Sequence, residues 1–143
     1  MDLAWGIIIL ALGLIGWLGQ LIAWLAPETA LRWSLMEAEA DVEPTYWADA
    51  RGEAAWDSLV LWVLPLAGLL LIVGDPNWTV PGLVGGGMYV YFGGRAIFAR
   101  RSMLGRGLRI GTPSTVRFAN VAMPAFGVVG LVTVVAAAMS IWA

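Results

Sequence analysis

The sequence predicts an all-α, polytopic integral membrane protein built as a four-transmembrane-helix bundle. Hydrophobic residues make up 60% of the 143 positions and charged residues only 13%, whereas soluble globular chains carry roughly one-quarter charged residues. Four apolar runs follow one another, and the charged residues gather between them. The expected spans cover about residues 3–25, 58–73, 79–99 and 116–142, joined by connections 26–57 and 100–115.

The first apolar run, residues 3–25, is uncharged and ends before Pro27. At about 1.5 Å per residue it is long enough to cross roughly 30 Å of hydrocarbon. A secretory signal peptide is the alternative for such a run. This run has no basic leading region and exceeds the roughly 7 to 15 residues of a signal core, so we expect a membrane span.

The second run, Ser58–Val73, has Pro65 near its middle, where we expect a kink that neighbouring helices can accommodate. The turn formers in residues 74–78 predict that it folds straight back into the third span. The fourth run is longer than the bilayer requires, so we expect it to tilt or project, with Pro124 as a second kink. Thr112 and Pro113 offer the capping chemistry for its start.

The segment Ala26–Asp41 is expected to form a short interfacial helix after the first span, with Leu31, Leu35 and Met36 turned to lipid or protein. Its acidic residues alternate with small ones between Glu37 and Glu43, an oxygen-rich pattern that could hold Ca²⁺ or Mg²⁺. The pattern lacks the spacing and the central glycine of a Ca²⁺ loop. A solvated acidic face is therefore the preferred interpretation.

The chain contains no Cys, His or Lys. These absences remove disulfides, thiolate nucleophiles, the commonest metal ligand and general base, and Schiff-base lysines. Gly85–Gly87 and Gly93–Gly94 are not a phosphate loop, because no Lys-Ser/Thr follows them and no strand precedes a helix there. The sequence therefore predicts no catalytic residue, no cofactor site and no metal site, and no nucleic acid as a partner.

All eight arginines fall on one side of the expected bundle, in or beside the two connections. Since arginine-rich connections stay inside the cell, this side is expected to be cytoplasmic. Both termini would then lie outside the cytoplasm, in a multi-pass protein of the cell (inner or plasma) membrane. The arginines are Arg32, Arg51, Arg95, Arg100, Arg101, Arg106, Arg109 and Arg117.

The two connections carry opposite charges. Residues 28–57 hold eight acidic residues and two arginines, whereas residues 95–117 hold six arginines and no acidic residue. We expect the connections to dock on each other. An equally weighted alternative, compatible with docking, is that the basic connection contacts anionic lipid headgroups at about 1 kcal/mol per arginine. The candidates for lipid contact are Arg100, Arg101, Arg106 and Arg109.

The hairpin of spans two and three also predicts ion pairs, because residues equally far from its turn lie at similar depth. Asp57 and Arg95 are equidistant from Pro76, and Glu53 comes level with Ala99 and Arg100. We therefore expect Asp57 to face Arg95, each charge making the other tolerable near the membrane interface. The structural ion-pair candidates are Glu53, Asp57, Arg95 and Arg100.

Small residues repeat along the third span at Gly82, Gly86 and Gly93, which places them on one helix stripe. Such stripes let membrane helices approach closely. Packing within the chain's own bundle is preferred over an oligomer contact. Tyr89 and Tyr91 in this span, and Asn120 in the fourth, are expected to make interhelical hydrogen bonds.

Three functions are compatible with these features. The preferred one is a structural, accessory or assembly subunit of a homo-oligomer or larger membrane complex, because the bilayer centre holds no ionisable residue. The alternative is an oligomeric channel or small-solute transporter, with a path lined by glycines, Tyr89, Tyr91 and Asn120. The third is a lipid-interacting membrane enzyme whose acid–base groups would come from Tyr46, Asp49, Glu53 and Asp57. The expected partners are membrane lipids and other membrane subunits.

Overall fold

The computed structural model describes residues 2–142, and within them the chain is helical and has no β-strand. The expectation of an all-α protein is confirmed. The longer helices are α1 (Asp2–Leu25), α3 (Pro44–Val60), α4 (Val63–Ile72), α5 (Thr79–Gly105) and α6 (Pro113–Trp142). The short ones are α2 (Pro27–Arg32), η1 (Glu39–Asp41) and η2 (Pro76–Trp78).

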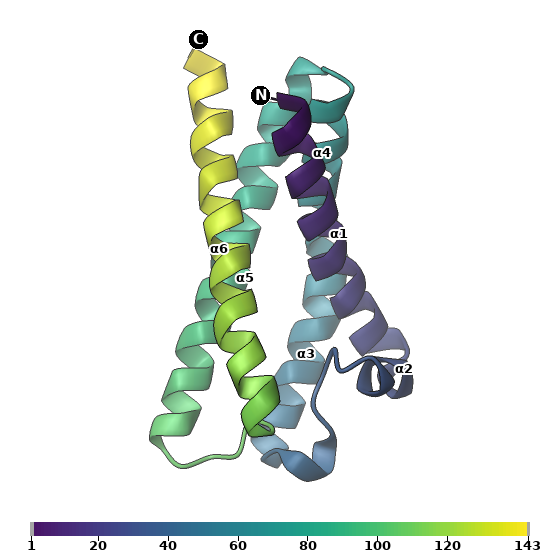
Figure 1. Ribbon diagram of the computed structural model, residues 1–143, viewed down its shortest axis with the longest axis vertical. Coiled ribbons are helices and arrows are strands. Elements are labelled where there is room, and N and C mark those ends of the chain that lie inside the picture. The colour runs from purple at the N-terminus through teal and green to yellow at the C-terminus, as the bar shows by residue number, and fades with distance from the viewer. Residues whose placement is uncertain (1, 143) are drawn as a thin grey trace.

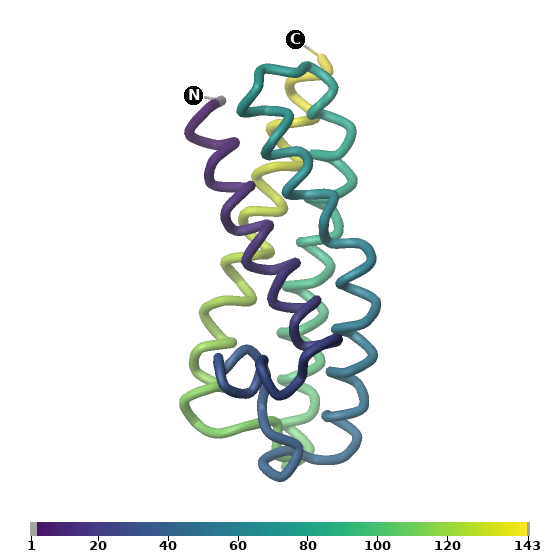
Figure 2. The backbone as a smooth tube through the Cα atoms, turned by 90° about the vertical axis from the view of Figure 1, so that its right-hand side faces the viewer, coloured from purple at the N-terminus to yellow at the C-terminus, as the bar shows by residue number. Residues whose placement is uncertain are grey.

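The long helices run side by side as an elongated bundle (Figure 1). The start of α1, the end of α6 and the turn at residues 74–78 lie at one end. The connections 26–43 and 106–112 lie side by side at the other end, here named the charged end (Figure 2). Three segments of the described chain are long and apolar enough to cross a membrane: Leu3–Leu25, Pro44–Ile72 and Pro113–Trp142.

The second segment is one long helical path with a break between α3 and α4 at Leu61 and Trp62. Pro65 explains the break, because it has no N–H to donate to the carbonyl of Leu61 and its ring clashes with that carbonyl. The expected kink is therefore present, one turn before the proline. The helical path begins at Pro44, well before the expected Ser58, since α3 continues through the charged residues.

Each long segment packs mainly on its neighbour in the sequence: α1 on α3 and α4, α4 on α5, and α5 on α6. Helix α3, beyond the break, approaches α5 little, and α6 hardly touches α1. The main core lies where α1, α4, α5 and α6 meet, and its buried residues include Ile9, Leu61, Leu64, Ala67, Leu71, Tyr89, Phe92 and Ala137.

The helices are tied together at mid-height by two polar contacts. The hydroxyl of Tyr89, fully buried in α5, donates a hydrogen bond to the carbonyl of Gly13 in α1. The indole of Trp17 donates to the carbonyl of Ser58 at 2.8 Å. Ser58 also donates its hydroxyl to the carbonyl of Ala55. The hydrogen bonds of Tyr89 and Trp17 thus satisfy one buried and one half-buried polar group between helices.

Glycines bring α5 and α6 into direct backbone contact. A Cβ on Gly86 would lie 2.8 Å from the carbonyl oxygen of Gly130, and one on Gly93 only 2.5 Å from that of Met123. Gly82, one turn earlier, faces Ala137 and the ring of Trp78. The stripe Gly82–Gly86–Gly93 therefore packs on α6 inside the same chain. Helix α6 stays continuous through Pro124, so the expected second kink does not break it.

The first connection holds less helix than expected. Helix α2 ends at Arg32, and Ser34 takes a left-handed conformation with φ of 55°. The amide of Leu35 then donates back to the carbonyl of Ala30, which closes the helix as a Schellman-type turn. The rest of the predicted interfacial helix 26–41 is extended or turned, with only η1 near its end.

Candidate functional site

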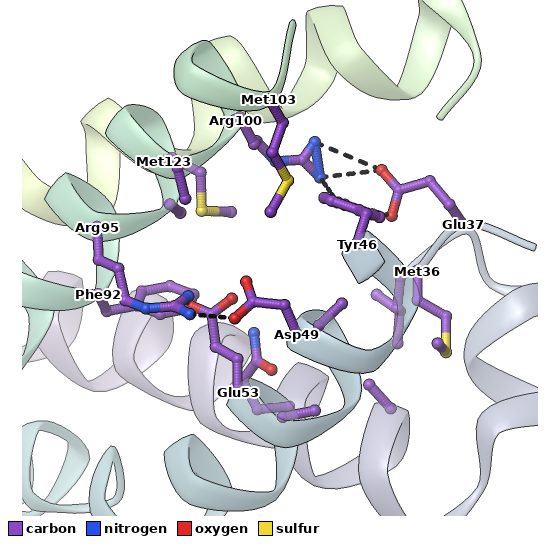
Figure 3. Close-up of a pocket in the computed structure, with 17 residues that line it drawn as sticks. Met36, Glu37, Tyr46, Asp49, Glu53, Phe92, Arg95, Arg100, Met103 and Met123 are labelled. Carbon is purple, nitrogen blue, oxygen red and sulfur yellow. Dashed lines mark hydrogen bonds and ion pairs between the residues drawn. The ribbon is translucent and has the colours of Figure 1, made fainter. Parts of the chain in front are cut away.

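The charged end holds a cluster of paired side chains that bridges the space between α3 and α5. Because the two helices approach each other little there, long arginine side chains span the gap. Arg95 and Arg100 come from α5, whereas their partners come from α3 and the first connection (Figure 3). This cluster is the candidate functional site.

Arg95 joins two carboxylates of α3. Its Nη2 lies 2.7 Å from Oδ1 of Asp49, as a hydrogen-bonded ion pair, and its Nη1 lies 2.6 Å from Oε1 of Glu53. The second contact is an ion pair as well. Asp49 and Glu53 are four residues apart and share one face of α3. The guanidinium of Arg95 thus links α5 to two successive turns of α3.

Arg100 makes the most enclosed contact of the cluster. Its Nη2 donates to Oε1 of Glu37 at 2.9 Å and to the hydroxyl of Tyr46 at 2.5 Å. The guanidinium also lies 5.4 Å from the centre of the Tyr46 ring, within cation–π range. Tyr46 completes the triangle by donating its hydroxyl to Oε2 of Glu37. Only 15% of the Arg100 side chain and 10% of the Glu37 side chain are exposed.

The two connections dock on each other through main chain and side chain. The amide of Glu43 donates to the carbonyl of Arg109 at 2.8 Å, and Val42 pairs with Ile110 as an isolated bridge. Val42, Tyr46 and Ile110 are buried together. The Arg109–Glu43 ion pair, at 3.2 Å, adds a more exposed contact. The docking expected from the opposite charges is therefore present, and the acidic residues Glu37 and Glu43 are engaged by arginines.

Arg51 ties α3 to the end of α1. Its guanidinium donates to the carbonyls of Ala23 and Trp24, in the last turn of that helix. These carbonyls lack partners within α1 because a helix leaves its last four unsatisfied. Sequence reasoning missed this contact, since nothing in the local pattern links Arg51 to residues 27 positions away. The only related prediction is that both connections lie at the same end of the bundle.

The cluster walls a cavity of about 110 Å³ beneath the end of α1. Its polar lining includes Gln20, Tyr46, Asp49 and Glu53, and its apolar lining includes the methionines Met36, Met103 and Met123 (Figure 3). Both bridging arginines line it as well. Its charged lining consists of the carboxylates of Glu37, Asp49 and Glu53 and the two guanidiniums that pair with them.

The expected ion pair between Asp57 and Arg95 does not form, and this prediction is wrong. Arg95 carries its guanidinium toward the charged end and meets Glu53 and Asp49, one and two turns before Asp57 on α3. Equal distance from the turn only places the Cα atoms of Asp57 and Arg95 at the same level along the bundle. A long arginine side chain carries its charge away from that level. Asp57 is left buried, 6% exposed, and its Oδ2 has no hydrogen-bond partner in the described chain. Of the other ion-pair candidates, Glu53 pairs with Arg95 and Arg100 pairs with Glu37.

The remaining predicted residues are the four arginines expected to contact lipid and the three polar residues expected to make interhelical hydrogen bonds. Of the four lipid candidates, Arg100 and Arg109 are held in ion pairs, whereas Arg101 and Arg106 are exposed and make no ion pair within the described residues. Tyr91 is 65% exposed. It and the exposed Asn120 make no side-chain hydrogen bond in that part of the chain, unlike Tyr89. Of these three residues, Tyr89 alone makes the expected interhelical hydrogen bond within the described residues.

No protein-family model matches the chain, and no curated protein and no solved structure matches it.

Proposed function

We propose that this chain is a four-span membrane protein that serves as a structural or assembly subunit of a homo-oligomer or a larger membrane complex. The observation that carries the proposal is the open side of α6. In its most apolar window only 17% of the residues are buried, against 44% in the segment formed by α3 and α4. Helix α6 packs on α5 and hardly on α1, so most of its apolar surface is free for contact with another membrane helix.

We infer that α5 is the fourth span because it packs along a helix that can itself span a membrane. Helix α5 lies along α6 from Gly82 to Gly93, and α6 is long and apolar enough to span. No charged residue occurs in α5 before Arg95. Its low apolarity comes partly from glycines, of which Gly85, Gly86 and Gly93 face α4 or α6 and need little contact with lipid. At about 1.5 Å per residue its 27 residues also exceed the length required for a crossing.

The orientation follows from the charges. The arginines lie in or beside the connections at the charged end, which we therefore place in the cytoplasm. Both termini then face away from the cytoplasm. Arg101 and Arg106, which are exposed and make no ion pair within the described residues, would contact anionic lipid headgroups on that side.

The internal pairing at the charged end supports a structural role over a catalytic one. Arg95 and Arg100 are both occupied by carboxylates of the same chain, and Tyr46 is held between Arg100 and Glu37. Such a cluster fixes two connections and two helices in one arrangement. That arrangement would present α6 as a rigid surface to a partner.

The test uses the absence of cysteine in the native sequence. Single cysteines at Val128 and Leu131, both more than half exposed on α6, are compared with one at Ile15, equally exposed on α1. Oxidative cross-linking in native membranes, followed by mass analysis of what copurifies in mild detergent, should give a specific partner or dimer from α6 only. A monomeric product without a partner, or equal cross-linking from α1, would overturn the proposal.

A further inference from the structure

A second hollow lies on the other side of Arg95, between α3 and α5. It is an open groove of about 360 Å³, within the range of small-molecule sites. Asp49, Glu53 and Asp57 line it from α3, together with Trp56, and Tyr91 and Arg95 line it from α5. Three carboxylates against one guanidinium give the groove an excess of negative charge.

Asp57 is the carboxylate in this lining that has no positively charged partner within residues 2–142. The guanidinium of Arg95 is engaged by Asp49 and Glu53, each within 2.7 Å, and none of the ion pairs in the described chain includes Asp57. The carboxyl is nonetheless 94% enclosed, being only 6% exposed, and its Oδ2 accepts no hydrogen bond. Burying a carboxylate without a partner is costly. The groove is therefore lined by a carboxyl group that has no counter-charge of its own within the described residues.

The other residues that line the groove favour an organic cation over a metal ion. Trp56 is 63% exposed and Tyr91 65% exposed, on the two helices that form the groove. Aromatic faces attract organic ammonium groups through the ring quadrupole. A divalent metal ion would need several free oxygen ligands, yet Asp49 and Glu53 are taken by Arg95, and the described residues contain no group of three side chains suited to a metal.

We propose that this groove is a binding site for an organic ammonium cation, with Asp57 as its charge partner and Trp56 and Tyr91 as its aromatic walls. The ammonium group can belong to a soluble amine or to the headgroup of a phosphatidylethanolamine molecule. The site stands beside the proposed subunit function and does not depend on it, because it uses α3 and α5 and leaves the open face of α6 free.

The test measures binding of benzylammonium, the protonated form of benzylamine, to the full chain in detergent micelles by saturation-transfer NMR, with protein-free micelles as the blank. The variant Asp57→Asn keeps the shape and removes the charge, and it should weaken binding by about tenfold or more. Trp56→Ala, at an exposed position, should weaken it several-fold. Asp41→Asn is the matched control, because Asp41 is exposed at the same end and lies outside the groove; it should bind as the unmodified chain does.

Two further comparisons make the outcome decisive. The thermal midpoint of Asp57→Asn shows whether that variant is folded; if it is not, Trp56→Ala carries the test. Adding phosphatidylethanolamine displaces the probe if the natural ligand is a lipid headgroup and leaves it bound if the ligand is a soluble amine. Equal affinity in all variants, absence of binding to the unmodified chain, or equal displacement by phosphatidylglycerol, which has no ammonium group, would overturn the site.

Discussion

Arg95 of α5 lies 2.7 Å from Asp49 of α3, although the two residues are 46 positions apart in the sequence. With Glu53 on its other nitrogen, this guanidinium joins Arg100, which contacts Tyr46, in linking two helices whose backbones approach each other little at the charged end. The contact therefore determines how far the bundle opens there.

Replacing Arg95 by methionine should destabilise the protein by about 1–3 kcal/mol, because Asp49 and Glu53 would be left partly buried without a counter-charge. Arg101→Met, at an exposed arginine without an ion pair, is the matched control and should leave stability nearly unchanged. Reversible unfolding in mixed micelles measures both. Equal stabilities of the two variants would show that Arg95 does not hold the helices together.

The ion pairs at the charged end should differ in strength according to their exposure. A double-mutant cycle with Glu37→Gln and Arg100→Gln should give a coupling of about 1–2 kcal/mol, because both side chains are largely enclosed. The same cycle at Glu43 and Arg109, where the arginine is 63% exposed, should give about 0–1 kcal/mol. The reverse order of the two couplings would contradict the structure.

The α5–α6 contact can be tested with two adjacent glycines. Gly93→Ala should destabilise the bundle by about 1–3 kcal/mol, because the new methyl group would meet the carbonyl of Met123. Gly94→Ala enters open space and should be neutral or stabilising by up to about 1 kcal/mol. The pair is compared by unfolding in micelles. A Gly94 variant as unstable as the Gly93 variant would argue against close packing at this stripe.

Contact with anionic lipid headgroups should depend on arginines that make no ion pair within the described part of the protein. The double variant Arg101→Gln/Arg106→Gln should weaken binding of the purified protein to micelles doped with phosphatidylglycerol, and the remaining binding should depend less on salt. Arg109→Gln, at a paired arginine, should change it less. Similar losses from all three positions would mean that the ion pairs open to lipid.

The sequence predicts the helices well where one physical signal dominates. Uncharged runs predict α1 and α6, Pro65 predicts the break at Leu61, and the glycine repeat identifies the face of α5 that packs. The opposite charges of the connections predict that they dock. Each of these follows from composition or spacing along a single helix.

The individual ion pairs could not be predicted in the same way. Distance from a turn gives the depth of Asp57 and Arg95 but says nothing of where the end of an arginine side chain lies, so Asp49 was missed as a partner. The end of α2 depends on a left-handed Ser34, although glycine usually takes that place. Likewise, Arg51 finds the carbonyls of α1 only once the fold brings them together.

The crossing of the membrane by α5 is the central claim, and cysteine labelling tests it most directly. Single cysteines are placed at Asn77, in the turn before α5, and at Ser114, near the start of α6, both exposed. A membrane-impermeant maleimide applied to intact cells should label Asn77→Cys at once and Ser114→Cys only after permeabilisation. Labelling of both positions from the same side would show that α5 does not cross, and would contradict the account.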